Sequence, residues 1–89
     1  MKEQLSDQGL LKTQAFINGR WVAAHDGATI DVTNPATGEI LARVAKVGAA
    51  ETAHAIEAAK KAMKSWRNLP AKVRSNILRE WFNIIMAHQ

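Results

Sequence analysis

All five glycines of this 89-residue chain lie before residue 49, and none follows it. They are Gly9, Gly19, Gly27, Gly38 and Gly48, spaced eight to eleven residues apart. Glycine marks tight turns because it adopts backbone angles that other residues avoid, and short strands fit between turns at this spacing. A stretch without glycine instead favours helices, since glycine is unfavourable inside them. The chain therefore divides into a β-rich part and a helical part.

We expect three segments: a polar N-terminal tail over residues 1–13, a β-hairpin arm over 14–47 and a helical hairpin over 48–89. The length allows one small domain at most. The absence of cysteine excludes a disulfide scaffold, a cysteine-ligated metal and a thiol nucleophile within this chain. No apolar run approaches a membrane span, and residues 1–14 lack the apolar centre of a secretory signal. We therefore expect a cytoplasmic protein with no membrane partner.

The arm begins with a strong hairpin signal at Asn18-Gly19. Asn-Gly supplies the two residues of positive φ that a type I′ turn requires, and apolar residues flank it on both sides. The pattern predicts strands near 14–17 and 20–24. Phe16 and Trp21 are then expected to contact each other across the two strands.

A second pair of strands follows the turn signal at Asp26-Gly27. Residues 29–33 alternate polar and apolar, as a half-buried strand does. Pro35 ends that strand, and residues 34–38 form a turn. A further strand is predicted over 40–47, which makes the arm a meander or a pair of hairpins.

The helical part opens with an alanine-rich segment, in which seven of the fifteen residues 49–63 are alanine. Alanine is the best helix former. Apolar residues recur there at steps of three and four, which predicts an amphipathic helix over 49–66. This stripe contains Ala53, Ile56, Ala59, Met63 and Trp66. Glu51 lies in the first turn, where the helix dipole favours a negative charge.

Pro70 ends this segment and is expected to lie in the first turn of a second helix, with Asn68 as its candidate cap. One face of the second helix is apolar. It carries Val73, Ile77, Leu78, Trp81, Ile84 and Ile85. A short link between two helices favours an antiparallel helical hairpin. No stop signal follows Trp81, so we expect the helix to run to the end of the sequence with its apolar face uncovered.

Motifs that carry chemistry are absent from the sequence. It contains no glycine-rich dinucleotide or phosphate loop and no nucleophile elbow. We expect His25 in a turn, His54 on a helix surface and His88 at a fraying helix end, all three solvated. Glu51 and Glu57 are six residues apart, so they do not converge as a carboxylate pair. We therefore predict no catalytic, cofactor-binding or metal-ligating residue in this chain.

The positive charge is concentrated in the helical part. Residues 1–45 carry four basic and five acidic groups, whereas residues 46–89 carry eight basic and three acidic groups. Solvated helix faces account for this imbalance, and we expect Trp66 and Trp81 to pack in apolar contacts. Two alternatives stay open. One is a free-standing basic module that binds nucleic acid, and the other is a segment that self-associates through its helical hairpin.

Four stretches, taken in order, resemble the N-terminal part of the aldehyde dehydrogenase family. They are residues 16–22, 30–39, 53–67 and 74–79. The most specific is Asn-Pro-Ala-Thr-Gly-Glu at residues 34–39, at this distance after Phe-Ile-Asn-Gly-Arg-Trp. Residues 81–83 and 86–89 most resemble NADP-preferring succinate-semialdehyde dehydrogenases. Val73 and Pro70 depart from the family, which commonly has an acidic residue and a serine or threonine there.

The resemblance implies an α/β parent fold that oxidises an aldehyde to a carboxylic acid with NADP or NAD. A cysteine thiolate and a glutamate-activated water would perform the chemistry, and this chain contains neither that cysteine nor the matching glutamate. Val32 and Thr33 occupy the place where backbone oxygens of some members hold a monovalent cation. The remaining ligands would lie beyond Gln89, so we assign no site to them.

The resemblance also implies partners. The arm and the helices would pack against the dinucleotide-binding domain of the same polypeptide, in a homodimer or homotetramer, and the substrate would be a small aldehyde such as succinate semialdehyde. We therefore expect this chain to be a truncated N-terminal fragment of such an enzyme. By itself it should be inactive and prone to self-association, because exposed apolar faces associate.

Overall fold

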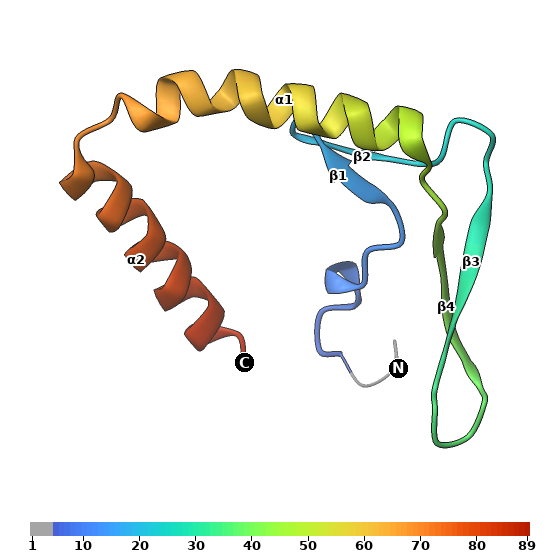
Figure 1. Cartoon of the computed structure of the whole chain (residues 1–89). Helices are drawn as coiled ribbons and strands as arrows, with labels where there is room; N and C mark the ends of the chain where they lie inside the picture. Colours follow the sequence, from blue (N-terminus) through green and yellow to red (C-terminus); the bar gives the residue numbers. More distant parts are fainter. Residues whose placement is uncertain (1–4) are drawn as a thin grey trace. The chain divides into compact units, whose positions relative to one another are not determined.

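The computed structural model describes residues 5–89, and it consists of two short antiparallel hairpins followed by two helices (Figure 1). The elements in chain order are the 3-10 helix η2 (Gln8–Leu10), strands β1 (Ala15–Ile17), β2 (Arg20–Val22), β3 (Thr29–Thr33) and β4 (Ile40–Ala45), and helices α1 (Ala49–Arg67) and α2 (Ala71–Ala87). The predicted order of hairpins and helices is confirmed. Two compact units are found, one that ends at Ala58 and one over Ala59–Gln89. The division at residues 13 and 47 stays a prediction.

The first hairpin is built around the predicted Asn-Gly turn. Asn18 has a φ of 52° and Gly19 a φ of 76°, the left-handed values that a type I′ turn needs. Strand β1 pairs with β2 so that Phe16 lies opposite Trp21, with their ring centroids 4.9 Å apart. The predicted cross-strand contact is therefore confirmed, although the strands are shorter than expected and β2 ends at Val22.

The second hairpin joins β3 to β4 through the predicted turn at residues 34–38. The side-chain oxygen of Asn34 accepts the N–H of Ala36 at 2.9 Å, and its carbonyl accepts the N–H of Gly38 at 2.7 Å. Gly38 has a φ of 76°, which only glycine adopts without strain. The pairing contains an irregularity between Val32 and Thr33, which bends the ladder.

The burial of the second hairpin differs from the sequence prediction. Every residue of β3 is exposed, so the expected half-buried strand is wrong. The ribbon has only two strands, and no third strand pairs with it among the described residues. Strand β4 also stops at Ala45 rather than at residue 47. At its end, the N–H of Ala45 donates to the carbonyl of Thr13 and the N–H of Lys46 donates to the carbonyl of Ala28.

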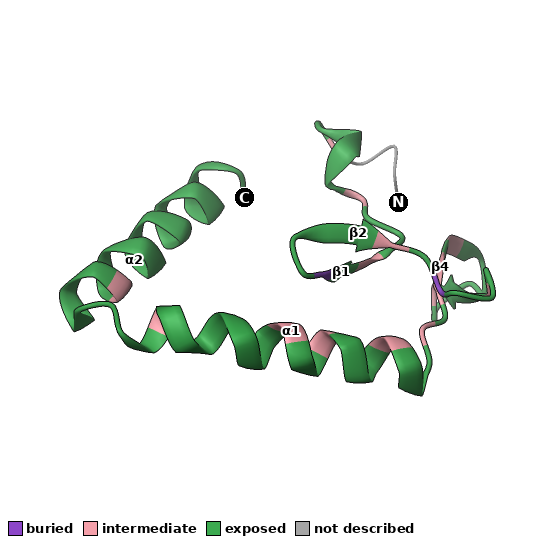
Figure 2. Ribbon diagram, turned by 90° about the horizontal axis from the view of Figure 1, so that it is seen from above, coloured by how far each residue is buried: buried purple, intermediate pink, exposed green. Residues whose placement is uncertain are grey.

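Only Ile17 and Ala24 are buried among the described residues, at 8% and 5% exposure (Figure 2). In the first unit, the half-buried residues of α1 are Glu51, Ala55 and Ala58. They are spaced four and three residues apart and therefore share one face of the helix. Ile56 is 60% exposed, so the covered face of α1 is not the apolar stripe that the sequence analysis selected. Apart from Glu51, the half-buried residues of this face are alanines.

In the second unit, α2 begins directly after Pro70 rather than including it. The carbonyl of Pro70 accepts the N–H groups of Val73 and Arg74, and no side chain caps the helix. The expected cap at Asn68 is therefore wrong, since Asn68 lies two residues too early to reach the first free amides. The side chain of Arg74 instead donates its Nε–H to the carbonyl of Leu69 at 3.2 Å.

The end of α2 also differs from expectation, because the helix stops at Ala87 and His88 caps it. The backbone N–H of His88 donates to the carbonyl of Ile85. Its ring atom Nδ1 lies 2.8 Å from the carbonyl oxygen of Ile84, which requires the proton on Nδ1. His88 is thus a helix cap and not a free side chain at a fraying end.

The apolar face of α2 is exposed in the second unit, every residue of which the structure describes. Trp81 is 61% exposed and Ile77 is 46% exposed. Trp66 and Arg74 are the only half-buried residues of this unit. The expectation that the apolar face of α2 is uncovered is therefore confirmed within this unit, whereas the expected apolar contact of Trp81 is absent there. The helical hairpin stays a prediction.

Replacement of Gly19 by alanine is expected to destabilise the first hairpin by about 1 kcal/mol, because the left-handed backbone angle is strained for alanine but not for glycine. Amide hydrogen exchange of β1 and β2 measures this loss. Asn18→Gly is the matched control, since glycine also accepts the left-handed angle at that position and the hairpin should persist. Equal protection in both variants would contradict the turn assignment.

Replacement of Trp81 by glutamate is expected to weaken self-association of the chain by about tenfold, since a charge then occupies the exposed apolar face. Sedimentation velocity across a dilution series measures the change. Ser75→Glu adds the same charge outside that face and should leave association unaltered. A monomer at every concentration in the unaltered chain would show that the face does not drive association.

Candidate functional site

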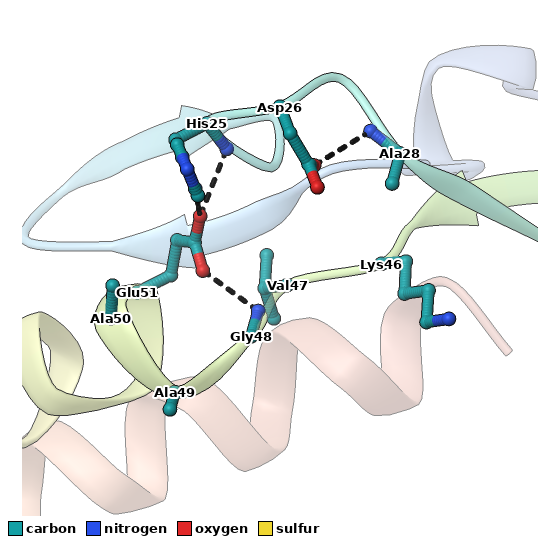
Figure 3. A pocket seen from close by; sticks show the side chains of 9 residues that line it. All are labelled: His25, Asp26, Ala28, Lys46, Val47, Gly48, Ala49, Ala50 and Glu51. Carbon is teal, nitrogen blue, oxygen red and sulfur yellow. Dashed lines mark hydrogen bonds and ion pairs between the residues drawn. The ribbon is translucent and has the colours of Figure 1, made fainter.

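The carboxylate of Glu51 joins two segments that are far apart in the sequence (Figure 3). Glu51 is the third residue of α1, and its Oε2 accepts the N–H of Gly48 at 2.7 Å. Its Oε1 accepts the backbone N–H of His25 at 2.9 Å and lies 2.8 Å from the ring Nδ1 of the same residue. The carboxylate of Glu51 thus caps the start of α1 and also binds the turn that follows β2.

Each hydrogen bond has a local reason in the sequence. A glutamate at the third helical position reaches back to the amide of the cap residue, and Gly48 occupies that cap position. Thr52 adds a bond from its hydroxyl to the carbonyl of Gly48 at 2.9 Å. On the other side, Asp26 stabilises the turn by accepting the N–H of Ala28 at 3.0 Å. The turn therefore presents both donors of His25 to the start of α1.

The electrostatics of the pair follow from these bonds. The backbone N–H of His25, then its ring, then the N–H of Gly48 stabilise the charged carboxylate and lower the pKa of Glu51 from 4.5 to about 2. The hydrogen bond to Glu51 raises the pKa of His25 above 6.5, and the charges of Glu51 and Asp26 add to this effect. The side chain of Glu51 is 12% exposed, whereas that of His25 is 79% exposed.

Glu51 lies in the first helical turn, as predicted, but the sequence does not identify its partner. His25 precedes Glu51 by 26 residues, and no local pattern links them. It was expected to be a solvated histidine without an orienting partner; its ring is exposed, and Glu51 orients it. The signal that was available is the glutamate three residues after Gly48, a capping-box spacing.

A cavity of about 230 Å³ surrounds this pair, and its walls come from the turn and from the start of α1. The lining residues with ionisable side chains are His25, Asp26, Lys46 and Glu51. The cavity is smaller than common ligand pockets, which hold about 300–1,000 Å³. The negative Glu51 also occupies the amide end of the helix that a phosphate would need. This site therefore does not fit a nicotinamide dinucleotide.

The other residues singled out by the sequence lie apart from this pair. His54 and Glu57 are exposed on α1, and His88 caps α2. Val32 and Thr33 flank the irregularity in the second hairpin. Residues 5–89 contain no group of three or more histidine or acidic side chains placed to hold a metal ion. Within the same residues, neither helix is long and apolar enough to cross a bilayer.

A second cavity of about 250 Å³ lies beside the first hairpin. It is lined by Leu11, Lys12, Thr13, Gln14 and Trp21. The ammonium of Lys12 lies 5.3 Å from the centre of the Trp21 ring, a cation–π distance. This lysine therefore covers one face of the exposed tryptophan, and the contact stabilises the link between the tail and the hairpin.

The fold of the chain matches that of part of a larger enzyme. A crystal structure described as an NADP-dependent enzyme of Escherichia coli superposes with a TM-score of 0.90 and 53% sequence identity. The match covers 96% of this chain and 18% of that chain. Both hairpins and both helices therefore lie within the region of similarity.

Curated relatives show the same relation. The chain is 54% identical over 86 residues to an NADP(+) succinate-semialdehyde dehydrogenase of Escherichia coli strain K12. It is 55% identical over 86 residues to a glutarate-semialdehyde dehydrogenase of Pseudomonas aeruginosa. Each match covers 97% of this chain, which spans 18% of the length of either relative.

The family comparison covers most of the chain. The model of the aldehyde dehydrogenase family matches residues 21–89, a range that contains three of the four stretches that carried the resemblance. This match, together with identities above one half to two semialdehyde dehydrogenases, confirms the resemblance. The chain belongs to the aldehyde dehydrogenase family.

Proposed function

We propose that this chain is the N-terminal part of an NAD(P)-dependent aldehyde dehydrogenase that oxidises the semialdehyde of a short dicarboxylic acid. The observation that carries the proposal is the identity of 54% to the succinate-semialdehyde enzyme over 97% of the chain. The substrate is an aldehyde with a carboxylate at its other end, and succinate semialdehyde is our first candidate. NADP is the preferred nucleotide, because the name of that relative specifies NADP(+).

Glutarate semialdehyde is the alternative substrate, because a relative of that name is 55% identical. The two identities differ by one part in a hundred, so this segment does not separate a four-carbon from a five-carbon substrate. The substrate class is therefore proposed as short dicarboxylic semialdehydes. The residues that select between them belong to other parts of the enzyme.

The role proposed for this segment is structural. The exposed face of α2, which includes Ile77 and Trp81, packs against the remainder of the same polypeptide. The complete enzyme is a cytoplasmic homodimer or homotetramer. None of its catalytic or nucleotide-binding residues lies in this segment, which contains no cysteine. The segment alone is inactive.

A chimeric enzyme tests this proposal. In the succinate-semialdehyde dehydrogenase of Escherichia coli, this chain replaces the matching 86 residues. The activity of the chimera is expected to lie within about tenfold of that of the parent enzyme. A packing mismatch that raises the activation free energy by about 1.4 kcal/mol lowers the rate about tenfold. The measurement is NADP+ reduction with succinate semialdehyde, glutarate semialdehyde and an uncharged aldehyde. The isolated chain should give no turnover.

A matched variant separates packing from chemistry. Trp81→Glu in the chimera places a charge on the face proposed to be covered, so we expect loss of soluble, active enzyme, whereas Ser75→Glu should retain it. A folded chimera that reduces no NADP+ with any of the three aldehydes would contradict the proposed function. Full activity of the Trp81→Glu chimera would contradict the proposed packing.

A further inference from the structure

We propose that His25 and Glu51 form a pH-dependent latch that fastens the turn after β2 to the start of α1, and that its hold weakens when the ring of His25 loses its proton. The pair lies within one compact unit, which ends at Ala58. The inference concerns the stability of this segment. It does not depend on the substrate or cofactor of the proposed enzyme.

The two carboxylate oxygens of Glu51 bind two different segments. Oε2 of Glu51 satisfies the amide of Gly48 at 2.7 Å, which fixes the carboxylate at the start of the helix. Oε1 then faces His25 and receives both its backbone amide at 2.9 Å and its ring at 2.8 Å. The helix cap therefore holds the carboxylate in place before the turn docks on it. This preorganisation lowers the entropy cost of docking.

The two bonds from His25 respond differently to pH. The backbone N–H is a donor at every pH of interest, so its bond persists while Glu51 is charged. The ring gives a charge-assisted bond only when it is protonated, and such bonds are about twice as strong as neutral ones. Loss of the ring proton therefore leaves a weaker latch rather than an open one.

Three other groups surround the histidine. Asp26 of the same turn is negative and, like Glu51 of α1, favours the protonated ring. Lys46, from the link between β4 and α1, lines the same cavity and carries the opposite sign. The ion pairs found among residues 5–89 join His25 to Glu51 and Arg43 to Asp31, and neither includes Lys46. Negative groups thus dominate around the ring.

The direction of each pH effect follows from the two pKa shifts. The pKa of His25 is raised above 6.5, so its stabilising contribution is complete below pH 6.5 and is lost as the pH rises through the folded value. The pKa of Glu51 is lowered to about 2, so its contribution is complete above pH 4.5 and is lost as the pH falls towards 2. The latch is strongest between pH 4.5 and 6.5.

Heteronuclear NMR of the 89-residue chain tests the latch. The ring of His25 should titrate at a higher pH in the unaltered chain than in the variant Glu51→Gln. After correction for intrinsic exchange, the amide of His25 should exchange about two- to fivefold faster above the titration of its ring than below it, the size expected for an exposed ion pair. The amide of Gly48 should change less, because its bond uses the other oxygen.

Two variants keep the test selective. Glu51→Gln retains an acceptor without the charge, so the titration of His25 should move to lower pH, and the pH dependence of its amide should disappear. His25→Lys keeps a positive charge through neutrality, so the protection of residue 25 should become independent of pH between 5 and 8. Glu57→Gln removes a carboxylate from the same helix and should change neither measurement.

Several outcomes would overturn the latch. One is a titration of His25 that is the same in Glu51→Gln as in the unaltered chain. Another is the same pH dependence of the His25 amide in Glu51→Gln as in the unaltered chain. Absence of protection at both Gly48 and His25 at pH 5.5, where both groups are charged, would also overturn it. None of these results affects the expected activity of the chimera. The latch and the proposed enzyme function are therefore tested independently.

Discussion

Hydrogen bonds between backbone groups close in sequence, rather than burial of apolar side chains, hold the described residues together. Among residues 5–89, only Ile17 and Ala24 are buried, which is far less than a stable core requires. The hairpins and helices pair their own backbone groups, so these groups need no core around them to be satisfied. The apolar faces they present are what a larger enzyme of this family would cover. The exposed apolar face of α2 is thus the surface on which the proposed structural role depends.

The elements that could be predicted from the sequence are those with local signals. Asn18-Gly19 requires two left-handed residues, and the structure has them. Asn34 and Gly38 build their turn from bonds within five residues. The alanine-rich segment forms α1 with an end one residue from the prediction. In each case the residues that decide the conformation are neighbours in the chain.

The features that could not be predicted depend on distant partners or on single atoms. Which face of α1 is covered depends on the rest of the unit, so Ala55 is half-buried while Ile56 is exposed. The contact between His25 and Glu51 spans 26 residues, and no periodic pattern in the sequence indicates it. The cap formed by His88 depends on a ring rotamer and a proton position. The first two features follow from tertiary structure and the third from one side-chain rotamer, and propensity encodes none of them.

The long span of the His25–Glu51 contact also orders the events of folding. The β3–β4 hairpin lies between these two residues, so its formation brings the turn after β2 close to the start of α1. The contact then closes over the few residues that remain on either side of the hairpin. A change that breaks the β3–β4 pairing would therefore also separate His25 from Glu51, although neither residue lies in a strand.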